Sequence, residues 1–170
     1  MIQVERKESG GFTLSLDRDS AEVLRQLPSQ LRQLLERDDF AEGLTARLFP
    51  RAYEDETLDA EYRQLAGGDL RKRKLETIAS FEKTLPASKR QQKITTVTLD
   101  EEAFAFWLGF LNDMRLVLAT ALDINDESWE RELDLEDPQA GPMALLHYLT
   151  QLEEILLQAT GILEPPPRKD

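Results

Sequence analysis

The stretch from Leu99 to Leu122 most constrains the fold, because it has the pattern of one long helix that is apolar on almost every side. A helix that is apolar all round is a buried one. We therefore expect a mainly α (α+β) fold, a helical bundle around this central buried helix. On a helical wheel the stretch has two apolar faces. Each face carries one charge near its centre, Asp113 on one and Arg115 on the other.

These two charges stand two residues apart, so they point away from each other and cannot pair directly. An unpaired buried charge costs several kcal/mol or more, so each needs a partner elsewhere. We expect Arg115 to pair with the acidic segment 54–61, and Asn112 to bond backbone groups of the loops. Asp113 is expected to pair with one of three arginines: Arg47, Arg51 or Arg63. Oppositely charged loops would then hold the helix from both sides; the alternative is that these polar residues form a ligand or partner site.

Short alternating segments predict a small antiparallel sheet on the N-terminal side. Residues 2–4 and 12–16 alternate apolar and polar positions, and Ser9-Gly10-Gly11 supplies the turn of a hairpin. The β-branched segment 94–98 is expected to join this hairpin as a third strand. Thr98 and Glu101 fit a capping box for the central helix.

The first helix is expected to start at Asp17 or Asp19 and to run to about Asp38. We predict a break near Leu27, because the residue before a proline is pushed out of the helical region and Pro28 follows. Its apolar row comprises Leu24, Leu27, Leu31 and Leu34. Beyond it, one or two helical turns are expected around Leu48, stopping before Pro50.

Two further helices are predicted between residues 55 and 86, separated by Gly67-Gly68. The first would start at Asp55 or Thr57 and show Leu58, Tyr62 and Leu65 on one face. Asp69 would cap the second, whose apolar face comprises Leu75, Ile78, Phe81 and Leu85. A joint this short makes two helices antiparallel neighbours. A last helix is expected from Met143 to about Thr160.

Composition sets the class of protein. We expect a single helical domain over residues 1–163 and an extended, Pro-rich tail over residues 164–170. With no cysteine, the chain has no thiol chemistry, and the cytoplasm is the expected location. No apolar run reaches the ~18 residues of a membrane span without interruption. The net charge of −12 disfavours broad contact with nucleic acid or anionic lipid.

The segment from Arg71 to Lys93 is nevertheless basic, because it contains eight basic and only two acidic residues. The candidate basic patch comprises Arg71, Lys72, Arg73, Lys74, Lys89 and Arg90. Its first four residues are expected in the first turns of a helix. Direct DNA binding through this helix is one alternative function, although stacking aromatic residues are missing from the run.

Chemistry-bearing residues are few, and we assign no catalytic, cofactor-binding or metal-binding residue. His147 is the single histidine and falls on the predicted water-facing side of the last helix. The acidic segment from Asp123 resembles a calcium loop only weakly, because Ser128 stands where that loop needs glycine. The carboxylate pairs Glu101-Glu102 and Glu153-Glu154 leave a metal-dependent phosphohydrolase as a second alternative.

Three segments carry a family resemblance: residues 48–53 (LFPRAY), 61–63 (EYR) and 111–118 (LNDMRLVL). Together they resemble a bacterial domain-of-unknown-function family that includes the actinomycete oxidative-stress regulator AosR. The resemblance implies a small cytosolic protein that regulates transcription by binding a protein partner such as a sigma factor. The matching residues, for which it implies no established role, are Tyr53, Arg63, Asn112, Asp113 and Arg115. Its redox-responsive members sense through cysteines, which this chain lacks.

The leading expectation is therefore a non-enzymatic protein-interaction module that regulates transcription or a stress response. The partner is a protein, and a homodimer through an exposed stripe of the last helix is a further possibility.

Overall fold

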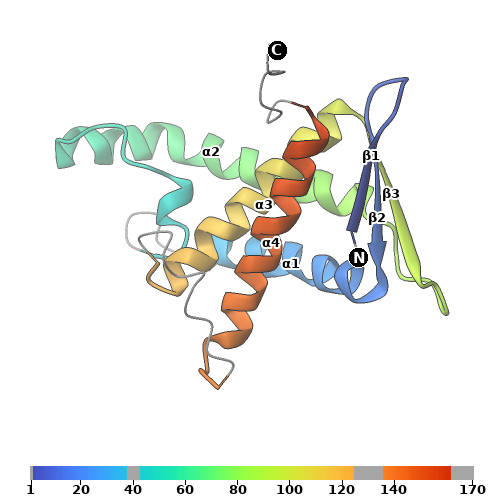
Figure 1. The fold of residues 1–170 in the computed structure, drawn as a ribbon. Coiled ribbons are helices and arrows are strands. Elements are labelled where there is room, and N and C mark those ends of the chain that lie inside the picture. The colour runs from blue at the N-terminus through green and yellow to red at the C-terminus, as the bar shows by residue number, and fades with distance from the viewer. Residues whose placement is uncertain (1, 38–42, 125–135, 162–170) are drawn as a thin grey trace, which may run out of the picture.

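The computed structural model describes residues 2–37, 43–124 and 136–161. Within them, helices surround a long central helix, and a small sheet lies at one end (Figure 1). In chain order the elements are β1 (Ile2–Arg6), β2 (Phe12–Asp17), α1 (Arg18–Arg37), the 3-10 helix η1 (Ala46–Leu48), α2 (Glu56–Thr84), β3 (Ile94–Leu99), α3 (Glu101–Ala121) and α4 (Ala140–Ala159). The predicted mainly α fold with a small antiparallel sheet is confirmed.

The sheet has the order β1-β2-β3, and both pairs of strands are antiparallel. Leu14 in the middle strand pairs with Val4 on one side and Val97 on the other. Alternate residues of β2 and β3 are buried, which is the pattern of a sheet with one face on the core. Gly11 has φ +82°, and a Cβ there would lie 2.4 Å from the Leu99 carbonyl oxygen, so the hairpin needs glycine at this position.

Helix α1 begins where expected, because the Asp17 carboxylate accepts a hydrogen bond from Ser20 N at 2.8 Å. The predicted break near Leu27 is wrong: α1 continues through Pro28. A proline inside a helix costs about 3 kcal/mol. Burial of the residues around it offsets that cost, because Leu24, Leu27, Pro28, Leu31 and Leu35 are all buried. Leu35, rather than the predicted Leu34, completes the buried row.

Helix α2 runs unbroken from Glu56 to Thr84, so the predicted stop at Gly67-Gly68 and the antiparallel pair of helices are wrong. Glycine weakens a helix interior by about 1 kcal/mol per residue, which lowers stability without forcing a stop. Both ends of α2 are fixed. Asp55 caps the start, with hydrogen bonds from the N–H groups of Thr57 and Leu58, and the burial of Ile78 and Phe81 fixes the other end.

The central helix α3 packs between α2 and α4 and supplies the large buried side chains Trp107 and Phe110. Phe81 of α2 stacks on Phe110, with ring centroids 4.0 Å apart, and the Trp107 indole N–H donates to Thr84 Oγ1 at 2.7 Å. The predicted capping box of Thr98 and Glu101 is wrong. Thr98 belongs to β3, and the carboxylate of Asp100 is the cap, accepting from Ala103 N at 2.7 Å.

Among the helices of the described ranges, α3 alone is long and apolar enough to cross a membrane, a test that a buried core helix also passes. In the fold its residues Asp113 and Arg115 both lie in ion pairs with neighbouring helices.

The first half of α2 extends past the other helices at the end opposite the sheet (Figure 1). We call residues 56–73 the α2 arm. The apolar face predicted for this segment is not buried: Leu58 is 49% exposed and Leu65 is 86% exposed. The antiparallel neighbour expected from a joint at Gly67-Gly68 would have covered this face, and the unbroken helix provides none.

Candidate functional site

Asp113 forms an ion pair with Lys74 rather than with an arginine. Its carboxylate is buried on α3 and accepts a hydrogen bond from Lys74 Nζ at 2.8 Å. Burial raises the pKa of Asp113, and the hydrogen bond from Lys74 counteracts part of that rise. The expected pairing with Arg47, Arg51 or Arg63 is wrong, because the unbroken α2 brings Lys74 to the buried carboxylate.

Arg115 likewise pairs with a helix rather than with the acidic segment 54–61. Its guanidinium forms an ion pair with Glu153 and donates to Thr150 Oγ1 at 3.1 Å, and both partners lie on α4. We predicted that oppositely charged loops hold α3 from both sides. This is wrong, because the partners of its two charges lie on the helices α2 and α4. Asn112 is exposed and belongs to neither ion pair.

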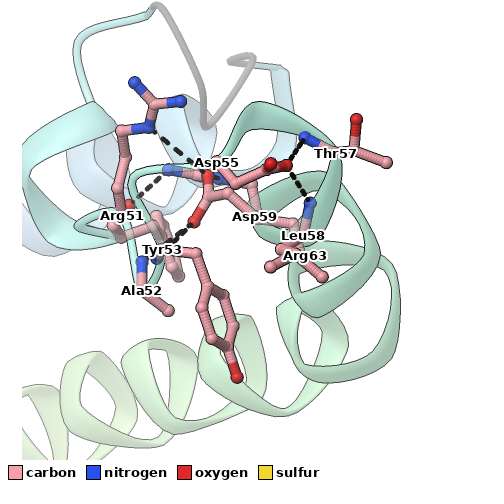
Figure 2. Close-up of polar contacts among 9 residues, drawn as sticks. Arg51, Ala52, Tyr53, Asp55, Thr57, Leu58, Asp59 and Arg63 are labelled. Carbon is pink, nitrogen blue, oxygen red and sulfur yellow. Dashed lines mark hydrogen bonds and ion pairs between the residues drawn. The ribbon is translucent and has the colours of Figure 1, made fainter.

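Arg63 takes part in a third network, which lies at the first turns of the α2 arm (Figure 2). Its centre is the buried carboxylate of Asp59. This carboxylate accepts hydrogen bonds from Arg63 Nε and from the backbone N–H of Ala52, each at 2.9 Å. Tyr53 N–H adds a longer bond of 3.4 Å, and Arg51 Nε lies 3.8 Å away. The hydrogen bond from Arg63 lowers the pKa of Asp59, and the two backbone N–H groups lower it further.

Asp59 and Arg63 therefore hold the segment before α2 against the helix. Arg63 also donates to the Phe49 carbonyl oxygen at 2.9 Å, which ties η1 to the same point. Tyr53 is 48% exposed, and its ring meets that of Tyr62 edge-on, with centroids 6.0 Å apart. The hydrogen bonds that Asp59 and Arg63 make to this segment and within the helix itself thus orient the start of the arm.

The candidate basic patch is not one surface. The run Arg71–Lys74 lies in the interior of α2 rather than in the first turns of a helix, and Lys74 is committed to Asp113. Lys89 and Arg90 lie in the loop beyond the far end of α2. At 1.5 Å per residue, the helix alone separates Arg73 from Thr84 by about 16 Å. The six residues of the candidate basic patch therefore lie in two groups, one on α2 and one in the loop that follows it.

The carboxylates proposed as metal ligands are not brought together. Among the described residues, no group of three or more acidic, histidine or cysteine side chains is placed to hold a metal ion. Glu153 is committed to Arg115, and His147 contacts Gln151 one turn along α4. Most of the weak calcium-loop segment, Ser128 and Trp129 included, lies outside the described residues, as does the predicted tail.

A hollow of about 510 Å³ lies where the end of α2 meets the start of α3. Its lining includes Lys83, Asp100 and Glu102. Asp100 already caps α3, so the hollow offers no set of converging free carboxylates.

What the geometry does present is an apolar stripe on a braced arm. Tyr53, Leu58 and Leu65 are among the large apolar side chains most exposed in the described chain. Single exposed apolar residues are ordinary, but Leu58 and Leu65 occupy one projecting helix. Tyr53 lies in the segment before this helix, which the Asp59–Arg63 ion pair holds in place. Such an arrangement can bind another protein surface without folding first.

Sequence reasoning found Tyr53, Arg63, Asp113 and Arg115 but missed the partners that use them. Asp59 stands four residues before Arg63, a spacing at which side chains on a helix meet, and this signal was available. In the sequence, Lys74 is one member of the basic run 71–74, and Glu153 is one of two adjacent carboxylates. No local pattern reveals that each contacts a distant helix.

A family model described as a domain of unknown function, DUF2017, matches residues 1–160. No curated protein and no solved structure matches the chain.

Proposed function

The chain belongs to the DUF2017 family, and we propose that it is a protein-interaction module that contacts its partner through the α2 arm. The single observation that carries this proposal is the exposure of Leu65, 86%, in the middle of a helix. An apolar side chain so placed gains nothing for its own fold. It gains free energy only when a second surface covers it.

The rest of the molecule supports an interaction role more than a chemical one. Asp113 and Arg115 serve the packing of α3, and Asp59 holds the segment before α2 against the first turns of the arm. The resemblance to the AosR group adds a regulatory role in transcription or stress response, in the cytoplasm. Thiol sensing is no part of this proposal, because the chain has no cysteine.

Site-specific photo-crosslinking in the native cell tests the interaction role. A photoreactive amino acid replaces Leu65 or Leu58 in the full chain, and Glu102 at the start of α3 is the exposed control position. We expect protein adducts that depend on light at both arm positions and not at residue 102. If the arm positions give no more adduct than residue 102, the proposal is wrong.

Mass spectrometry of the adducts tests the regulatory part separately. A transcription factor or stress-response protein joined to the arm supports it. Adducts made only with different proteins that have no such role contradict the regulatory part while the interaction role stands. An adduct with a second copy of this chain supports the interaction role and does not bear on the regulatory part.

A further inference from the structure

We infer that the occupant of the α2 arm is a second copy of this chain, paired antiparallel across a two-fold axis. This inference rests on the proposed function and names its partner. Four observations carry it: the spacing of the residues on the outer face of the arm, their exposure, their charges and the placement of Gly68.

The outer face of the arm has the spacing of a helix-pairing seam. Leu58, Glu61, Leu65, Gly68 and Lys72 follow one another at intervals of three, four, three and four residues. This is the a/d spacing with which two helices pack side by side. All five residues are exposed, whereas Lys74 and Leu70 face the body of the molecule. The seam thus points away from the core.

The charges on two copies of the seam complement each other only when the copies are antiparallel. Glu61 lies toward the start of the arm and Lys72 toward its end, so an antiparallel copy places each Glu61 opposite Lys72 of the other copy. A parallel copy would set Glu61 against Glu61 and Lys72 against Lys72. In the described part of the chain, neither side chain takes part in an ion pair, so both are available.

The same register places the exposed leucine over a glycine. When Glu61 faces Lys72, Leu65 faces Gly68 of the second copy, and the two-fold axis passes between these residues. A Cβ on Gly68 would meet nothing within 4 Å, so the chain's own packing does not require glycine there. A glycine at a helix crossing lets two backbones approach closely. The pairing therefore gives both Leu65 and Gly68 a role that the single chain does not.

Sedimentation equilibrium of the full chain from about 1 μM to about 1 mM tests the pairing, because contacts this small give weak dimers. We expect a reversible monomer–dimer equilibrium that Leu65→Glu abolishes. Glu61→Lys and Lys72→Glu should each raise the dimer Kd about tenfold, since each sets like charges opposite one another at two symmetric places. The double variant Glu61→Lys/Lys72→Glu should restore the wild-type Kd. Circular dichroism confirms that each variant is folded.

Engineered cysteines test the orientation, because the natural chain has none to interfere. In the proposed pair the two Leu65 positions lie about 4.5 Å apart along the axis, and Leu65→Cys should form a disulfide-linked dimer on oxidation. Lys83→Cys is the matched control: it is exposed on the same face of α2, but the two copies lie about 50 Å apart in this register. A parallel pair would link both variants and contradict the inference.

A monomer at every concentration, a dimer indifferent to Leu65→Glu, or a charge reversal that fails to restore the Kd would each overturn self-pairing. A monomeric chain that still forms photo-adducts with another protein at residue 65 overturns this inference and leaves the proposed function standing. Absence of any adduct there overturns the proposed function itself.

Discussion

Lys74 Nζ lies 2.8 Å from Asp113 Oδ1 and joins the longest helix of the described fold to its central helix. The lysine side chain is 28% exposed, whereas the carboxylate is 3% exposed. The pair is therefore asymmetric: without Lys74 the carboxylate would remain buried with no cation, whereas Lys74 can reach water.

Lys74→Met should consequently be more damaging than Asp113→Asn. Breaking a buried pair from one side costs about 3–5 kcal/mol, and the partial exposure of Lys74 places this case at the lower end. We expect Lys74→Met to lower the free energy of unfolding by about 3 kcal/mol at neutral pH. Urea titration of both variants and the wild type measures the order, and equal stabilities would contradict the asymmetry.

The deficit of Lys74→Met should shrink in acid. Burial raises the pKa of Asp113, so the folded state holds this proton more tightly than the unfolded state does. Stability from this group is present below its unfolded pKa and is lost as the pH rises through the folded pKa. Removing Lys74 removes a contribution that lowers this pKa, so the variant titrates at higher pH than the wild type. In urea titrations from about pH 7 down to about pH 4, the free energies of unfolding of the variant and the wild type should converge. A difference that stays constant with pH would contradict the role of Lys74 as the partner of the Asp113 carboxylate.

Arg115→Met should loosen the contact between α3 and α4. It leaves Glu153, whose side chain is 13% exposed, without its cation, and it removes the bond to Thr150. Because Arg115 itself is 32% exposed, we expect the free energy of unfolding to fall by about 1–3 kcal/mol. For a domain of this size, this loss corresponds to a fall in Tm of about 3–10 °C. Glu153→Gln, whose amide oxygen can still accept from Arg115, should cost less. An unchanged Tm in Arg115→Met would show that the pair does not tie the helices.

The elements that local patterns determine were predictable. The alternation in β2 and β3, the apolar density of α3 and the caps at Asp17 and Asp55 each depend on neighbours in the chain. The errors fall where a distant contact outweighs a local preference. Pro28 stays helical because its surroundings are buried, and Gly67-Gly68 stays helical because both ends of α2 are fixed.

The candidate site shows the same division. The wheel placed Asp113 and Arg115 on opposite faces of one helix, which is correct, but their partners depend on which helices pack against those faces. Leu58 and Leu65 of the predicted apolar face lie exposed on the α2 arm. Three apolar residues at helical spacing look alike whether they meet the core or a second molecule, and only the fold distinguishes the two.

Asp59→Asn should loosen the first turns of the α2 arm and leave the core intact. The amide can accept from Ala52 N–H, but it loses the charge that pairs with Arg63. Hydrogen exchange should then show faster exchange of the amides in residues 52–66, while those of α3 keep their protection. Asp69→Asn, an exposed carboxylate on the same helix, is the control and should change neither region. Uniform loss of protection throughout the chain would instead make Asp59 a core residue rather than a brace for the arm.

Gly67→Ala should stabilise the chain. The residue lies inside α2 without a positive φ, and a Cβ there would meet nothing within 4 Å. Alanine then brings its higher helix propensity and a less flexible unfolded chain, together about 0.5–1 kcal/mol of added stability. Gly68→Ala should stabilise the isolated chain equally, because its surroundings are as open, yet it should weaken self-pairing by adding a methyl group at the crossing point. Urea titration at low protein concentration measures the first effect and sedimentation equilibrium the second. If both alanine variants pair as tightly as the wild type, the two helices do not cross at Gly68.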